Sequence, residues 1–110
     1  MRIIISLVVV LGISLSSVVS ASEEDFEVFS VKDQNGWPIL VRYHRGTGAV
    51  WLAFKGRYKL VKENEDLPKS EYKVIEHNLQ SHWRICRIDK KTGKTWFYNG
   101  SKWEAVAEET

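Results

Sequence analysis

Cysteine is nearly absent from this chain of 110 residues, since Cys86 is the only one. A lone cysteine excludes an internal disulfide, although small exported domains often need disulfides because they bury little surface. The 7 glycines are dispersed, and no glycine-rich run of the kind that cradles phosphate is present. The longest apolar run, residues 3–13, is shorter than the ~20 residues that a membrane-spanning helix needs. These absences exclude a disulfide-stapled fold and a phosphate loop, and they argue against a membrane-spanning helix.

The first 21 residues have the organisation of a signal peptide. Arg2 supplies the positive charge, the apolar run follows, and Val19-Ser20-Ala21 places small residues where a signal peptidase reads. We expect cleavage after Ala21; an uncleaved anchor or a core helix is the alternative. The residue directly after the expected cut is not a cysteine, which excludes a lipoprotein anchor. The sequence thus predicts export to the periplasm or the medium, with no membrane span after cleavage.

Charge of one sign is not in excess. Removing 21 residues from 110 leaves 89, with 15 Lys and Arg against 14 Asp and Glu because only Arg2 is lost. This balance gives no reason to expect binding to nucleic acid or to an anionic membrane. The 89 residues suffice for one small domain. Its 5 Trp, 4 Tyr and 4 Phe predict a core held by aromatic packing.

Short β-branched and aromatic segments separated by turn residues predict strands throughout residues 22–110. Residues 26–61 read as a unit of four strands, residues 62–70 as a polar connector containing Pro68, and residues 71–106 as a second four-strand unit. The second unit repeats the first at a spacing of 45 or 46 residues. Two unrelated hairpins obeying the same turn rules are the alternative explanation.

Identities support the repeat. Between residues 41–61 and 86–106, five of 21 pairs are identical, whereas ordinary residue usage gives about one. The identical pairs are Arg42/Arg87, Thr47/Thr92, Gly48/Gly93, Trp51/Trp96 and Val61/Val106. Because these residues recur at turns and in strands, the match indicates a repeated structure.

Glycines mark the hairpin turns. Gly48 and Gly93 are expected in the left-handed conformation that closes a four- or five-residue loop. Asp89 is expected to accept hydrogen bonds from the backbone of its loop, whereas His44 at the matching place predicts a less sharp turn. Asn99-Gly100 is the strongest hairpin signal in the chain and predicts a two-residue type I′ turn. Lys55-Gly56 is a weaker signal at the matching turn.

Alternation along the strands predicts which side chains face the core. The following residues are expected to point inward: Ile39, Val41, Tyr43, Trp51, Ala53, Tyr58, Leu60, Cys86, Ile88, Trp96, Tyr98, Trp103 and Ala105. Arg42, Lys59, Arg87 and Glu104 are expected to point outward. A four-stranded sheet leaves one apolar face in water, so the two units should close on each other. The prediction is an all-β small antiparallel barrel or sandwich of about eight strands.

No catalytic constellation is recognisable. Cys86 lies in an apolar strand and is expected to be a buried, inert thiol. His44, His77 and His82 lack metal-ligand spacing, and the acidic runs lie in the connector and near the N-terminus, where charges are usually solvated. We therefore expect no metal, no cofactor and no enzymatic activity.

Binding residues are the remaining candidates. Trp37 and Trp83 lie beside the expected inward set, and exposed indole rings can stack on sugars. The second four-strand unit also carries a basic group that would suit a carboxylate- or phosphate-bearing partner: Arg84, Arg87, Lys90, Lys91 and Lys94. The alternative is that the tryptophans belong to the core and the lysines keep sheet edges soluble. The predicted partner is a protein or, alternatively, a glycan of the cell wall; the sequence leaves open the oligomeric state and whether Cys86 pairs between chains.

The hairpin around Asp89, Thr92, Gly93 and Trp96, followed by the strand with Trp103, forms a D-x-x-T-G-x-x-W motif. It resembles a hairpin of small, uncharacterised exported or membrane-tethered bacterial proteins. The resemblance implies a bacterial source and a β-rich fold. It implies no activity, substrate or cofactor.

Overall fold

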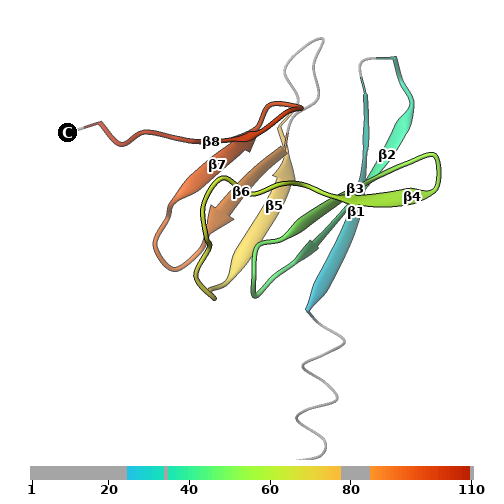
Figure 1. Cartoon of the computed structure of the whole chain (residues 1–110). Coiled ribbons are helices and arrows are strands. Elements are labelled where there is room, and N and C mark those ends of the chain that lie inside the picture. Colours follow the sequence, from blue (N-terminus) through green and yellow to red (C-terminus); the bar gives the residue numbers. More distant parts are fainter. Residues whose placement is uncertain (1–24, 34, 78–84, 110) are drawn as a thin grey trace, which may run out of the picture.

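The computed structural model describes residues 25–33, 35–77 and 85–109 and consists of β-strands joined by turns (Figure 1). The predicted signal peptide lies outside the described residues. The strands are β1 (Phe26–Lys32), β2 (Pro38–His44), β3 (Val50–Phe54), β4 (Arg57–Leu60), β5 (Tyr72–Glu76), β6 (Ile85–Asp89), β7 (Thr95–Tyr98) and β8 (Trp103–Ala105). In the part of the chain that is described, no helix is long and apolar enough to span a membrane. The all-β prediction is confirmed.

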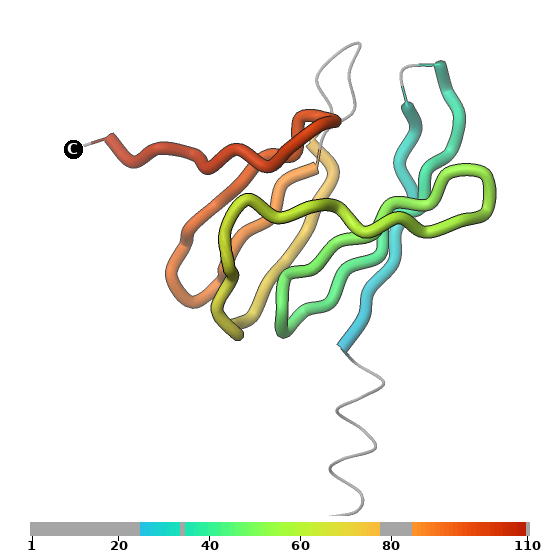
Figure 2. The backbone as a smooth tube through the Cα atoms, in the orientation of Figure 1, coloured from blue at the N-terminus to red at the C-terminus, as the bar shows by residue number. Residues whose placement is uncertain are grey.

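The strands form two antiparallel four-stranded sheets in the orders β1-β2-β3-β4 and β5-β6-β7-β8. We call them sheet one and sheet two. Each is a meander in which every strand pairs with the next, and the chain passes between the sheets once, through residues 61–71 (Figure 2). The two similar units of four strands are thus confirmed. They do not join into a closed barrel, so the barrel, one of the two predicted architectures, is wrong.

A single core lies between the sheets. Ile39, Val41, Tyr43, Val50 and Leu52 of sheet one pack in one cluster with Tyr72, Val74, Ile85, Trp96 and Trp103 of sheet two. Backbone contacts join the sheets at the β2–β3 loop, where the N–H of Tyr72 donates to the carbonyl of Arg45 at 2.7 Å. Each sheet covers the apolar face that the other would leave in water.

The β2–β3 and β6–β7 loops are equivalent, and the prediction that His44 gives a less sharp turn is wrong. The Nδ1 atom of His44 accepts hydrogen bonds from the N–H groups of Gly46 and Thr47, both at 3.1 Å. In the same way, Asp89 Oδ1 accepts hydrogen bonds from the N–H groups two and three residues further along its loop, at 3.0 and 3.4 Å. Gly48 and Gly93 have φ values of 79° and 83°. A ring nitrogen therefore replaces a carboxylate oxygen without changing the turn.

The two shorter turns reverse the predicted ranking. Lys55 and Gly56 have φ values of 53° and 79°, and Phe54 pairs with Arg57 across them. Two positive φ values in a two-residue loop define a type I′ turn, so this turn forms at the weaker signal. In the corresponding turn of sheet two only Gly100 has a positive φ, because the side-chain Oδ1 of Asn99 instead accepts hydrogen bonds from the backbone N–H groups of residues 101 and 102. Asn99 thus stabilises the loop from its edge.

The predicted assignment of faces is wrong for about half of the strands. Arg42 pairs with Trp51 across β2 and β3, and cross-strand partners share a face. Trp51, Ala53, Tyr58 and Leu60 therefore lie with Arg42 on the outer face of sheet one, while Lys59 lies on the other side.

In sheet two the inward face is the opposite face of the repeated unit. Arg87 pairs with Trp96, and both are buried in the core. Cys86 and Ile88 instead occupy the outer face, where Ile88 is exposed. Tyr98, Trp103 and Ala105 lie on the inner face and Glu104 on the outer face, as predicted.

Burial of Tyr43 makes stability depend on pH in alkaline solution. Its hydroxyl donates to Glu27 Oε1 at 2.7 Å, and burial together with this hydrogen bond raises the pKa of Tyr43 to about 12. An unfolded tyrosine ionises near pH 10. The unfolded chain therefore loses its proton first, and stability that is complete below pH ~10 falls as the pH rises towards 12. Ultraviolet difference titration of the wild-type protein against Tyr43→Phe should show that the phenol of Tyr43 ionises near pH 12. Ionisation of this phenol near pH 10 would contradict the prediction.

Candidate binding face

Arg87 is a charged residue inside the core. Its side chain is fully buried, and its guanidinium carbon lies 4.6 Å from the ring centroid of Trp96 and 4.1 Å from that of Trp103. Its terminal nitrogens donate to both carboxylate oxygens of Glu63, at 2.8 and 3.0 Å, and to the carbonyl of Gly48 at 2.9 Å. The charge is thus neutralised by a residue of the connector and by the backbone of the facing sheet.

Arg42 repeats this arrangement on the outer face of sheet one. Its guanidinium carbon lies 4.5 Å from the ring of Trp51 and 4.1 Å from that of Tyr58, with Phe26 at 5.6 Å. These distances match those of Arg87, because Trp51 and Tyr58 occupy the places of Trp96 and Trp103 in the repeat. Within the described residues, no carboxylate forms an ion pair with this guanidinium.

The surroundings of Arg42 are apolar and half open to water. Strand register places the following residues on this face: Phe26, Val28, Leu40, Arg42, Trp51, Tyr58 and Leu60. We call this set the Arg42 face. Val28 and Leu60 are 53% and 55% exposed, whereas Val74, the counterpart of Val28 in sheet two, is buried. The Arg42 face thus leaves in water several apolar side chains whose counterparts in sheet two are covered.

The aromatic rings fix the Arg42 guanidinium in place. A planar cation over two rings is attracted by their negative faces, and its rigid fork of N–H donors matches the shape of a carboxylate. The Nε atom of Arg42 is buried without a hydrogen-bond partner among the described residues, and so is Nε of Arg87. The outer face therefore holds a pre-oriented fork of donors suited to a carboxylate.

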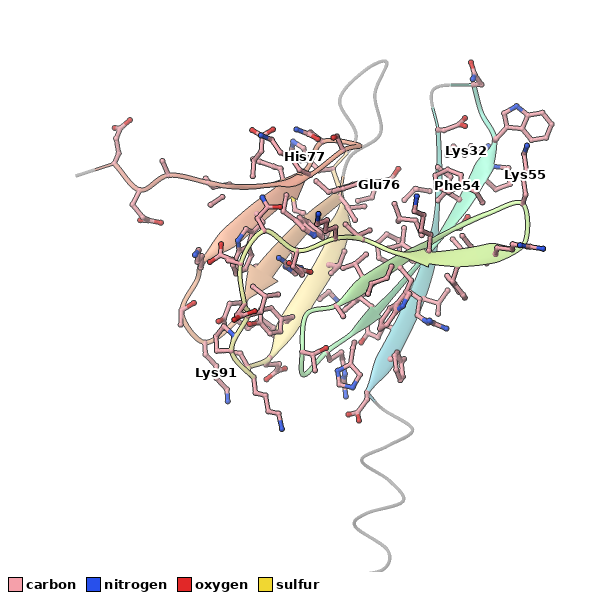
Figure 3. All side chains as sticks on the ribbon, viewed as in Figure 1. Lys32, Phe54, Lys55, Glu76, His77 and Lys91 are labelled. Carbon is pink, nitrogen blue, oxygen red and sulfur yellow. The ribbon has the colours of Figure 1, made fainter. Side chains whose placement is uncertain are left out.

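Trp37 lies at the end of the Arg42 face. Its indole is 69% exposed and lines an open, mainly apolar hollow of about 620 Å³ together with Asp33, Leu40 and Phe54. Leu40 belongs both to this hollow and to the Arg42 face, so the two surfaces are continuous. Figure 3 shows Phe54 and Lys55 near the β3–β4 hairpin, whose turn borders the hollow.

The residues of the predicted basic group in the second unit do not lie together on one surface. Arg87 is in the core and does not reach the surface, which corrects its assignment as an outward binding residue. Lys90 pairs with Glu71 at 3.1 Å and Lys94 with Glu65 at 3.0 Å. Lys91 is exposed near the end of its loop (Figure 3). Trp83 and Arg84 lie outside the described residues, as does His82.

Titratable groups with shifted pKa values have structural explanations. Partial burial raises the pKa of the Cys86 thiol, so its reactive thiolate is less populated than in an exposed cysteine. The hydrogen bond from Ser70, helped by backbone N–H groups of the loop, lowers the pKa of Asp89. Bonds from Lys94 and from the indole of Trp96 lower the pKa of Glu65. The described residues contain no group of three or more His, Cys, Asp or Glu side chains that could hold a metal ion.

Sequence reasoning overlooked Arg42 as a candidate residue, although the signal was present. The repeat aligns Arg42 with Arg87, and the hairpin loop fixes the pairing of Arg42 with Trp51 and of Arg87 with Trp96. Those two facts together predict an arginine–aromatic stack in each sheet. Which of the two stacks would be buried does not follow from either fact.

Comparison with known proteins gives no match. No family model fits the chain, and neither the curated proteins nor the solved structures contain a similar one.

Proposed function

We propose that this protein is an exported, non-enzymatic binding domain whose docking surface is the Arg42 face. The proposed ligand is a protein that presents a carboxylate beside an apolar sheet surface. The observation that carries the proposal is the matched pair of arginines, one buried against a carboxylate and one still open. The neighbourhood of Arg87 serves as the template for what the equivalent residue would bind.

The chemistry of the Arg87 stack defines the expected ligand. There, the aromatic face lies on an apolar sheet surface formed by Val41, Val50 and Leu52, and Glu63 supplies the anion. Arg42 has the ring stack and the apolar surroundings, but no carboxylate of the described residues pairs with it. Because a guanidinium–carboxylate pair is strengthened when apolar contacts exclude water around it, the two halves of the surface act together.

The test is capture of partners from the bacterial envelope with the wild-type chain and with Arg42→Glu. Charge reversal at the centre of the face should abolish recovery of the specific partner, because like charges then meet. Lys59→Glu is the matched control, since it reverses an exposed charge on β4 on the opposite side of the sheet. Equal capture by all three proteins, or equal loss in both variants, would contradict the proposal.

A glycan of the cell wall is a second candidate ligand, supported by Trp37 and the adjoining hollow. An exposed indole beside Asp33 combines a flat stacking surface with a hydrogen-bonding carboxylate. Titration with peptidoglycan fragments should shift the tryptophan emission of the wild-type protein, and Trp37→Ala should remove the shift. No change in emission at millimolar ligand would exclude this candidate.

A further inference from the structure

The two sheets of this chain bury opposite faces of the repeated unit. Sheet one contributes the face that carries Val41 and Leu52, whereas sheet two contributes the opposite face of the repeated unit, which carries Arg87 and Trp96. Packing of like faces would have buried the same positions in both units. Each outer surface of the molecule is therefore the counterpart of a surface that is already buried in its core.

The Arg42 face corresponds to the buried face of sheet two. Phe26 and Leu40 take the places of Tyr72 and Ile85 in the repeat; the first two are exposed and the last two are buried. The same structural unit is thus covered in one sheet and open in the other.

The outer face of sheet two corresponds to the buried face of sheet one. Register places Ile75, Cys86, Ile88 and Phe97 together there, at the positions that Phe29, Val41, Tyr43 and Leu52 occupy in sheet one. Ile75 is 51% exposed. The centre of this surface is apolar, as the inner surface of sheet one is, with Lys73 and Glu104 on its two edge strands, and no sheet covers it among the described residues.

The carboxylate also has a counterpart. The N–H of Val61 donates to the carbonyl of Val50 at 2.8 Å as the chain leaves sheet one, and Val106 donates to Thr95 at 2.9 Å as it leaves sheet two. Glu63 lies two residues after Val61 in the sequence, and Glu108 lies two residues after Val106. The C-terminal segment that carries Glu108 runs away from sheet two, and this residue is exposed (Figure 1).

We infer that the partner at the Arg42 face is a second copy of this chain. The outer face of sheet two of one copy covers the Arg42 face of the next, and Glu108 of the first copy binds Arg42 of the second as Glu63 binds Arg87. This inference rests on the proposed function and specifies its partner. Because the two joined surfaces differ, the contact is heterologous and produces open rows or closed rings of molecules.

The test is sedimentation of the full chain, as processed by the cell, over a range of concentrations. We expect the wild-type protein to form either a series of species that grow beyond a dimer or one closed ring of defined size. Arg42→Glu and Glu108→Arg should each weaken association by about 100-fold or more, because each places like charges in the contact. Glu109→Arg is the matched control and should associate like the wild type.

Mixing the variants tests the pairing of Arg42 with Glu108 across the contact. Arg42→Glu and Glu108→Arg each repel their own copies, but a mixture of the two should associate again, because every contact between unlike variants joins opposite charges. The double variant carries both reversed charges and should regain self-association.

A wild-type chain that stays monomeric at millimolar concentration would overturn this inference, as would a dimer indifferent to Glu108→Arg. If such a monomer still captured an envelope protein through Arg42, the proposed function would stand and only the identity of the partner would be wrong.

Discussion

Replacing Arg87 by alanine is expected to lower the free energy of unfolding by about 3–5 kcal/mol. The substitution leaves Glu63 without its partner, removes the filling between Trp96 and Trp103, and leaves the carbonyl of Gly48 without its donor. Small domains are stable by only about 5–15 kcal/mol, so the loss is a large part of the total. Urea unfolding monitored by tryptophan fluorescence and circular dichroism measures it.

Arg42→Ala is the matched control for this prediction. It removes an equivalent arginine–aromatic stack that is partly open and unpaired, so it should cost only about 0.5–1 kcal/mol. If Arg87→Ala does not fold, the double variant Arg87→Met, Glu63→Leu is informative, because replacing a buried ion pair with apolar side chains is often neutral. Similar losses for Arg42→Ala and Arg87→Ala would show that the buried pair adds little.

Gly48→Ala is expected to cost about 2–4 kcal/mol, which adds backbone strain to overpacking. Gly48 has a φ of 79°, and a Cβ there would lie 3.0 Å from Leu67 Cδ1 and 3.1 Å from two ring atoms of Tyr72. Tyr72 is buried and hydrogen-bonded to the carbonyl of Pro68, so its ring has little room to move. The change should also disturb the contact between the β2–β3 loop and β5.

Gly93→Ala separates the two causes. Gly93 has a φ of 83° in the equivalent loop, but a Cβ there would meet no atom within 4 Å. Only the strain remains, which is worth about 1–2 kcal/mol. Thermal unfolding of the two variants should therefore place Gly48→Ala clearly below Gly93→Ala. Equal melting temperatures would mean that the ring of Tyr72 yields without cost.

Much of the fold was predictable because strands and turns depend on local chemistry. Alternating apolar residues and the glycines at 48 and 93 were sufficient to place the hairpins. The short turns were ranked wrongly, because the preference of Asn99-Gly100 for a type I′ turn lost to the hydrogen bonds that the Asn99 side-chain oxygen accepts from the backbone. A dipeptide preference describes the backbone alone and ignores such competing bonds.

The candidate site was less predictable. Lys90, Lys91 and Lys94 looked like one basic group, but Glu71 pairs with the first and Glu65 of the connector with the last. Arg87 looked like a surface residue because alternation places it on the opposite face of its strand from Cys86 and Ile88, which were expected in the core. Its carboxylate partner lies 24 residues away in sequence, and no local pattern joins the two.

The sequence by itself determined that the chain folds as two similar four-stranded sheets. Strand periodicity and turn glycines depend on neighbouring residues, and the 45-residue repeat can be found by comparing the sequence with itself. Only the tertiary structure decided which face of each sheet is buried. Both faces of the unit carry apolar side chains, so alternation groups the residues without saying which group meets water. The connector made that choice by bringing Glu63 to Arg87, which left Arg42 open.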